Sequence, residues 1–132
     1  MICKVGTPIE RLLLVEHNLL FRDCLALLLQ WRTGLSSDLA STLAEARCVL
    51  GQENRKPTCA IVDLDLPEGE GHELLEQLDG IPVLALSRGL NLERQAEAIG
   101  LGTDQVLDIR GPVEKIVAAV ERLIGPGSIS VF

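Results

Sequence analysis

The stretch from Thr58 to Gly71, Thr-Cys-Ala-Ile-Val-Asp-Leu-Asp-Leu-Pro-Glu-Gly-Glu-Gly, decides how this chain folds. Its apolar run from Cys59 to Val62 is typical of a short strand buried on both faces, as in a parallel sheet. The run stops at Asp63, and the Pro67 and glycines that follow predict a loop, because proline fixes φ and glycine allows positive φ. In an open α/β sheet, ligands bind just beyond the carboxyl ends of the strands. Asp63 is therefore either a reacting group at that edge or a carboxylate that caps a turn.

Strands and helices alternate along the whole chain. Four further short runs predict strands at residues 12–15, 35–40, 82–86 and 105–109, and helical spacing predicts helices at residues 19–33, 43–50, 70–78, 91–99 and 112–124. This alternation predicts right-handed crossovers and a parallel sheet with helices on both faces. We expect a three-layer α/β domain of the flavodoxin-like, doubly wound class, with five parallel strands in the order 2-1-3-4-5. Residues 1–126 are expected to form this domain, and residues 127–132 a tail or the start of a linker.

Apolar residues at helical spacing predict which side of each helix faces the core. Two such faces are Leu20, Cys24, Leu27, Leu28 and Trp31 in the first helix, and Leu92, Ala96 and Ile99 in the fourth.

Composition excludes several classes of function. The chain has 132 residues with a net charge of −7, so it is long enough for one core and too acidic to favour binding of nucleic acid. Aromatic residues make up only 2%, which argues against platforms for stacking bases or a flavin ring. No apolar run is long enough to cross a bilayer, and the first residues lack the apolar region of a signal peptide. We expect a cytoplasmic location with no membrane contact.

The four cysteines are Cys3, Cys24, Cys48 and Cys59, and no two form a C-x-x-C pair. Three of them lie in apolar segments and are expected to be buried. We interpret them as reduced thiols, which is typical of a cytosolic protein.

Ionisable and hydroxyl side chains follow the predicted strands. Glu16 and His17 follow the first strand, Asp63 ends the third, and Ser87 follows the fourth. Two neighbouring carboxylates repel each other unless a cation lies between them, and Mg²⁺ prefers carboxylate oxygens. A carboxylate beside a metal ion can accept a phosphoryl group, because the metal neutralises charge during the transfer.

The sequence resembles the receiver domain of two-component response regulators, especially receivers of the LuxR-type helix-turn-helix regulators. The resemblance covers about residues 11–124. It rests on Leu-Leu-Leu-Val-Glu-His-Asn-Leu-Leu-Phe-Arg at 12–22, Ala-Ile-Val-Asp-Leu-Asp-Leu-Pro-Glu-Gly-Glu-Gly at 60–71, Pro-Val-Leu-Ala-Leu-Ser at 82–87 and Gly-Thr-Asp at 102–104.

The resemblance implies a role for each of these positions. Asp63 would be the phosphoacceptor, with Glu16 and His17 at the positions of the acidic pair. The backbone carbonyl of Asp65 would complete a Mg²⁺ site, and Ser87 would be the switch hydroxyl that bonds the phosphoryl group. The implied function is a signalling switch rather than an enzyme. A histidine kinase or a small phosphodonor would phosphorylate it, and a downstream protein or a fused output domain would read it.

The chain departs from the family pattern at four positions. His17 stands where the family has its second acid, and imidazole is a poor ligand for Mg²⁺. Ile109 stands in place of a lysine that contacts the phosphoryl group, so Arg88 and Arg110 become the candidate cations for that contact. Arg88 itself replaces a small residue, and Val106 replaces the switch aromatic residue.

These departures leave three hypotheses. The chain is either an atypical receiver phosphorylated on Asp63, with a weakened Mg²⁺ site, or a receiver-like protein-interaction module that works without phosphorylation, as a candidate homodimer. The third hypothesis, a small flavin enzyme of the same fold, would need a phosphate-binding loop and aromatic stacking, and the sequence offers neither.

Overall fold

The computed structural model describes residues 10–52 and 56–125, so Cys3 and the tail expected at residues 127–132 lie outside the described residues. The strands are β1 (Arg11–Val15), β2 (Ser36–Ala40), β3 (Cys59–Asp63), β4 (Val83–Ser87) and β5 (Gln105–Asp108). The helices are α1 (Leu19–Thr33), α2 (Leu43–Leu50), α3 (Glu70–Gln77), α4 (Leu92–Gly100) and α5 (Val113–Ile124), with a 3₁₀ turn, η1 (Pro67–Gly69), before α3.

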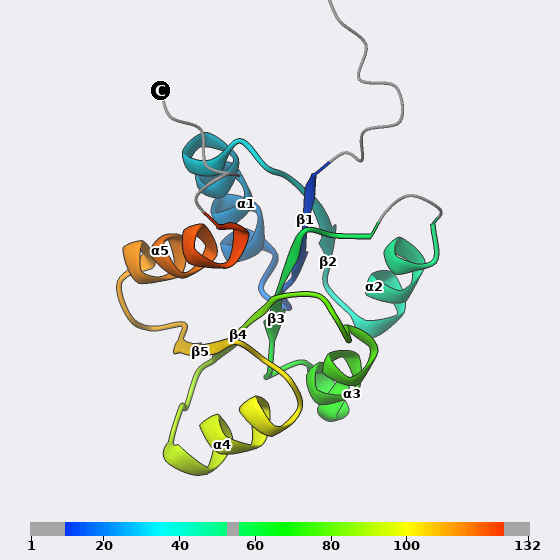
Figure 1. The fold of residues 1–132 in the computed structure, drawn as a ribbon. Helices are drawn as coiled ribbons and strands as arrows, with labels where there is room; N and C mark the ends of the chain where they lie inside the picture. Colours follow the sequence, from blue (N-terminus) through cyan, green and yellow to red (C-terminus); the bar gives the residue numbers. More distant parts are fainter. Residues whose placement is uncertain (1–9, 53–55, 126–132) are drawn as a thin grey trace, which may run out of the picture.

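The strands form one parallel sheet in the order β2-β1-β3-β4-β5, which confirms the predicted doubly wound fold. Helices α1 and α5 cover one face of the sheet, and α2, α3 and α4 cover the other (Figure 1). Because β1, β3 and β4 lie inside the sheet, their side chains are buried on both faces. This explains why these three strands read as continuous apolar runs in the sequence.

Side-chain caps fix where three of the helices begin. The side chains of Asn18, Thr42 and Asn91 each accept a hydrogen bond from the backbone N–H three residues later, at the start of α1, α2 and α4. Gly34 ends α1 in the left-handed conformation with φ of 81°, as glycine at this position usually does. These local signals are the reason that the sequence predicts most helix boundaries to within about two residues.

The buried face predicted for α1 is wrong for four of its five residues, and only Leu28, which is partly buried, packs against the core. Leu20, Leu27 and Trp31 are 76%, 70% and 80% exposed, and Cys24 is exposed as well; we call these four residues the α1 stripe. The helix instead packs on the sheet through residues one position further along, chiefly Leu25 and Leu29. Since α1 is apolar around most of its circumference, spacing alone does not select the face that meets the sheet.

The predicted face of α4 is also wrong. Leu92 is 85% exposed and Ile99 is 51% exposed, whereas Ala98 is fully buried. Arg94 is half-buried because it turns toward the loop after β3. The helix therefore meets the core through Ala98, and its first turn contacts the loop after β3 through Arg94.

Of the described cysteines only Cys59 is buried, so the expectation of three buried thiols is wrong for Cys24 and Cys48, which are exposed. The side chain of Cys59 packs in the core between the sheet and helices α1 and α5. Burial raises the pKa of its thiol to about 12. In the part of the chain that the structure describes, no helix has the length and apolar character needed to span a bilayer.

Candidate functional site

The parallel sheet brings three distant residues to one edge. Asp63 is the last residue of β3, Glu16 directly follows β1, and Ser87 is the last residue of β4. In the sheet register Asp63 lies opposite Leu86, and Val15 lies opposite Val62. The side chains of Glu16, Asp63 and Ser87 are all almost completely buried.

Backbone amides hold the carboxylate of Asp63. The N–H of Asp65 donates to its Oδ1 at 2.8 Å, and the N–H of His17 donates to its Oδ2 at 3.2 Å. Both donors come from loops that leave the sheet at this edge, so the carboxylate links the ends of β1 and β3. The imidazole of His17 lies on an exposed residue, and only the backbone of His17 bonds Asp63.

The surroundings of Glu16 at this edge raise the pKa of its carboxyl. Its Oε2 accepts a hydrogen bond of 2.8 Å from the N–H of Asn18, whereas its Oε1 is buried and has no hydrogen-bond partner among the described residues. Burial, opposed by the Asn18 bond and reinforced by the negative charge of Asp63, raises the pKa of Glu16 to about 7. The positive charge of Arg88 acts in the opposite direction. Near neutral pH, a proton bound to Glu16 or a cation beside it would therefore stabilise this carboxyl group next to Asp63.

The side chain of Asp65 turns away from this pair. Its Oδ2 accepts a hydrogen bond of 2.7 Å from the N–H of Arg88, and its Oδ1 lies 2.9 Å from Nη2 of Arg94 on α4. These contacts connect the loop after β3 with the loop after β4 and the first turn of α4. Both oxygens of the Asp65 carboxylate thus have partners within the fold, and it is the backbone N–H of Asp65 that contacts Asp63.

The remaining predicted residues lie around the ends of β4 and β5. The N–H of Ile109 donates a hydrogen bond of 2.9 Å to the backbone carbonyl of Ser87. Ile109 therefore lies beside Ser87, directly after β5. Arg110 is paired with Asp108 through two guanidinium contacts of 3.0 and 2.8 Å, and this pairing holds the pKa of Asp108 well below its usual range. Val106 is buried in the core on the α2, α3 and α4 side of the sheet.

Gly71 lets the start of α3 pass close to the end of β3. A Cβ at this position would lie 2.5 Å from the backbone oxygen of Asp63 and 3.0 Å from the Cα of Leu64. Both are backbone atoms, which cannot move aside as a flexible side chain would. The glycine in the quoted motif is therefore required by a close approach of two backbone segments beside the site.

The donor set at this edge fits a Mg²⁺ ion held by two protein carboxylates. Glu16 offers a buried oxygen without a partner beside the carboxylate of Asp63, and Mg²⁺ is usually bound through one or two carboxylates with water and phosphate oxygens as its other ligands. In the described part of the chain, no cluster of three or more His, Cys, Asp or Glu side chains is arranged to hold a metal ion.

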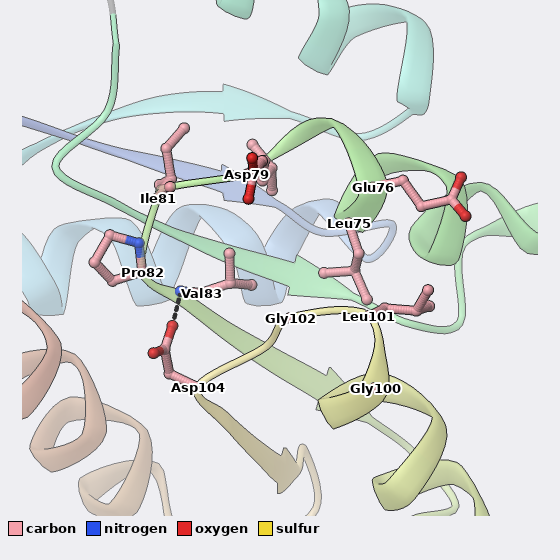
Figure 2. A pocket seen from close by; sticks show the side chains of 12 residues that line it. Leu75, Glu76, Asp79, Ile81, Pro82, Val83, Gly100, Leu101, Gly102 and Asp104 are labelled. Atoms are coloured by element: carbon pink, nitrogen blue, oxygen red, sulfur yellow. Dashed lines mark hydrogen bonds between the residues drawn. The ribbon is translucent and has the colours of Figure 1, made fainter.

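A cavity of about 570 Å³ lies elsewhere, at the amino ends of β4 and β5 (Figure 2). Its wall includes Leu75 from α3, Val83 from β4 and Leu101 from the turn after α4. Asp104 accepts a hydrogen bond of 2.8 Å from the N–H of Val83, which braces the start of β4. The cavity is thus separated from Asp63 by the length of the strands.

A sequence profile of the response regulator receiver domain matches residues 12–121. The chain belongs to this family. No curated protein sequence gives a significant match. The resemblance seen in the sequence and the fold seen in the structure thus agree with the family assignment.

Solved receiver structures share the fold. A response regulator from Burkholderia pseudomallei, described with a phosphorylated aspartic acid, a calcium ion and citrate, is 27% identical with a TM-score of 0.74; the match covers 85% of this chain and 66% of that one. The non-phosphorylated HemR receiver domain from Leptospira biflexa is 24% identical with a TM-score of 0.77, covering 87% and 94%. A LuxR-family regulator from Aurantimonas sp. SI85-9A1 is 22% identical with a TM-score of 0.76, covering 86% and 84%. This chain therefore spans just under two thirds of the Burkholderia protein.

Reasoning from the sequence missed one residue of the network, Arg94. It lies 29 positions from its partner Asp65, so no local pattern connects the two residues. Its only local signal is that it stands at the third position after Asn91, the cap of α4, which places it in the first turn beside the strand ends.

Proposed function

We propose that this receiver domain is an atypical signalling switch in which Asp63 accepts a phosphoryl group from a histidine kinase or a small phosphodonor. The observation that carries the proposal is the buried pair of Glu16 and Asp63, in which one glutamate oxygen has no partner and the aspartate is oriented by two backbone N–H groups. A carboxylate held in this way at the carboxyl edge of a parallel sheet has the position expected of a reacting group.

In the proposed reaction, an Oδ atom of Asp63 attacks the phosphorus of a phosphohistidine or an acyl phosphate. A P–O bond to Asp63 forms while the P–N or P–O bond to the donor breaks, and the bonding electrons leave with the donor. The hydroxyl of Ser87 and the N–H groups that face Asp63 would donate hydrogen bonds to the phosphoryl oxygens. Arg88, whose charge already acts on Glu16, would take the place of the family's lysine.

Glu16, Asp63 and the backbone carbonyl of Asp65 are the groups proposed to hold Mg²⁺, which when bound supplies positive charge to the transferring phosphoryl group. Because the pKa of Glu16 is raised to about 7, a proton competes with the metal ion at this oxygen. We therefore infer that the site binds Mg²⁺ weakly at neutral pH and more tightly above it.

Phosphorylation would act on the rest of the fold through the contacts of the β4–α4 loop. The new charge at Asp63 would draw Ser87 toward it and move the neighbouring Arg88, whose N–H is bonded to Asp65. The proposed result is a shift of α4 and the end of β5, where a downstream protein or a fused output domain would read it. Val106 fills the core at the position of the family's switch ring, so the proposed readout is a helix shift without a ring flip.

Intact-mass spectrometry tests the proposal. Wild-type protein incubated with acetyl phosphate and Mg²⁺ is expected to gain the mass of one phosphoryl group, and the Asp63→Asn variant is expected to gain none. A Ser87→Ala variant, in which Asp63 is kept, serves as the second control and is expected to retain labelling with altered stability of the adduct. If the mass of the wild-type protein does not increase under conditions that label an ordinary receiver, the proposal is wrong.

A second candidate function is a protein-interaction module that works without phosphorylation. The observation that favours it is the replacement of the phosphate-contacting lysine by Ile109, together with the commitment of Arg110 to Asp108. On this proposal Asp63 has a structural role in joining the ends of β1 and β3. The Asp63→Asn variant would then bind its downstream partner with the wild-type affinity. If the chain is instead a phosphorylated switch, acetyl phosphate should change partner binding in the wild type but not in this variant.

A further inference from the structure

The α1 stripe is the largest group of exposed apolar side chains on one described helix. Leu20, Leu27 and Trp31 are each at least 70% exposed, and Cys24 lies between them. A contiguous apolar surface of this kind on a folded domain marks a contact site, because single exposed apolar residues are common but clusters are not.

The spacing within the stripe is that of a coiled-coil seam. Positions 20, 24, 27 and 31 follow one another at intervals of 4, 3 and 4 residues, which is the d-a-d-a pattern of a heptad repeat. Such a seam runs straight along the helix for roughly 17 Å and suits packing against another helix at a small crossing angle.

The stripe is also self-complementary. If two copies of α1 pack antiparallel about a two-fold axis, Leu20 of one copy faces Trp31 of the other, and Cys24 faces Leu27. Each pairing then occurs twice, as a two-fold interface requires. No other segment needs to be supplied, since both halves of the contact are present in this chain.

A hollow of about 300 Å³ extends this surface from α1 to the edge strand β2. Leu27 and Leu39 lie in its wall, together with Ala26, and Leu39 is itself 39% exposed. Apolar side chains of a second copy can enter this hollow beside the seam. The hollow therefore improves the shape complementarity of the contact beyond that of one helix ridge.

The area is sufficient for a weak dimer. Trp31 exposes on the order of 200 Å², and Leu20 and Leu27 each expose on the order of 100 Å². Interfaces are about 60% apolar, so this apolar area corresponds to roughly 650 Å² per copy, near the lower limit of specific interfaces.

Charge favours a second copy at this face over other faces. The whole chain carries a net charge of −7, but α1 contains two arginines and one aspartate. Arg22 is paired with Asp23 at 2.9 Å, and Arg32 is paired with Glu114 of α5 at 2.9 Å. The charges at α1 are therefore balanced, so two acidic molecules can meet there without the repulsion expected at a face with a net negative charge.

We propose that this chain forms a homodimer through antiparallel packing of the α1 stripe. The surface lies on α1 and the edge of β2, away from α4, so the dimer does not depend on phosphorylation of Asp63. This inference goes beyond the proposed function, and the Asp63→Asn variant is expected to dimerise like the wild type.

Sedimentation velocity tests the dimer over protein concentrations from about 5 to about 500 µM, a range that brackets the micromolar affinity of small interfaces. Wild type is expected to shift from monomer to dimer. Trp31→Glu and Leu27→Glu are expected to raise the dissociation constant at least about 30-fold, as for large apolar residues that anchor an interface. Leu92→Glu, which changes an equally exposed leucine on α4, is the matched control and should dimerise normally. Circular dichroism confirms that each variant is folded.

Cysteine crosslinking gives a second readout that needs no variant of the apolar residues. In the proposed dimer the two Cys24 thiols lie on the order of 10 Å apart, because they flank the two-fold axis of a helix pair. A short bis-maleimide should therefore give a crosslinked dimer, identified by peptide mass spectrometry as Cys24 to Cys24. Cys24→Ser should abolish this product and Cys48→Ser should retain it.

A monomer throughout the concentration range would overturn the proposal. So would a dimer that survives Trp31→Glu and Leu27→Glu but is lost in Leu92→Glu, since α4 would then be the interface. A crosslinked product that runs through Cys48 rather than Cys24 would also overturn it.

Discussion

The guanidinium of Arg94 lies 2.9 Å from Oδ1 of Asp65, and this contact joins α4 to the loop that follows the candidate phosphoacceptor. The other carboxylate oxygen of Asp65 accepts the N–H of Arg88. One side chain thus ties the loops after β3 and β4 together at the edge of the sheet. The pair is partly exposed, so its direct contribution to stability is at most about 1 kcal/mol. It also places a positive charge beside Asp65, in the loop that directly follows Asp63.

If Glu16 and Asp63 hold Mg²⁺ as proposed, replacing Arg94 by alanine is expected to tighten Mg²⁺ binding by roughly three- to tenfold, because the negative charge of Asp65 is no longer balanced near the proposed metal site. Isothermal titration calorimetry at low ionic strength measures the change. The control is Arg47→Ala, which removes a similar 2.9 Å pair with Glu73 between α2 and α3. Equal effects of both variants would show that only the net charge of the protein matters.

Substituting Ile109→Lys is expected to speed phosphorylation of Asp63 by acetyl phosphate roughly 10- to 100-fold, since a charge-assisted hydrogen bond contributes about 1.5–3 kcal/mol. Ile109 directly follows β5, and its N–H donates to the backbone carbonyl of Ser87. A lysine at this position would therefore begin at the same edge of the sheet as Asp63. Time-resolved intact-mass measurement gives the rate. Ile109→Met has similar length without the charge, and an equal gain in that variant would rule out the electrostatic explanation.

The raised pKa of Glu16 predicts how stability depends on pH. The folded protein holds this proton up to about pH 7, whereas the unfolded chain releases it near the ordinary value of 4.5. Between these values the native state binds more protons, so the free energy of unfolding falls as pH rises, by about 1–3 kcal/mol in all. Urea denaturation in EDTA at several pH values measures this slope.

The Glu16→Gln variant provides the control for that experiment. Glutamine does not titrate, so the fall in stability between about pH 5 and pH 8 should largely disappear. Adding Mg²⁺ to wild type should offset the loss at the upper end of the range, because a cation replaces the proton between the two carboxylates. A slope that is identical in wild type and Glu16→Gln would assign the pH dependence to other groups.

Gly71→Ala is expected to lower the free energy of unfolding by about 1–3 kcal/mol, because the new methyl group would overlap the backbone at Asp63 and Leu64. Denaturant titration of the free energy measures the loss. Gly89→Ala is the matched control, since a Cβ there meets nothing within 4 Å, and it should change stability by less than about 0.5 kcal/mol. Similar losses in both variants would contradict the close-approach explanation.

The order of the strands and the edge that carries the site could be predicted from the sequence, because buried parallel strands are apolar on both faces. The run that ends at Asp63 is the clearest case, with all five residues of β3 buried. What spacing did not predict was the orientation of helices. In α1 two apolar stripes lie one residue apart, and only the position of Leu25 and Leu29 over the sheet decides which is buried.

Polar contacts between distant segments were also beyond the reach of the sequence. The Asp65–Arg94 pair joins residues from different loops, and no local pattern records which arginine turns inward. The raised pKa of Glu16 likewise results from burial beside Asp63, which only the assembled sheet produces. The sequence predicts which chemical groups occur at the strand ends, but their pairing depends on the fold.

The cavity at the amino ends of β4 and β5 has a practical consequence for anyone who handles this protein. Val83 lies in its wall, while Ser87, at the other end of the same strand, borders the site, so the two are separated by about 13 Å. A dye or a biosensor tether attached at Asp79, which lines the cavity, would leave the candidate site at Asp63 undisturbed. Immobilisation through that residue therefore presents both the strand ends and the exposed helix surface to solution.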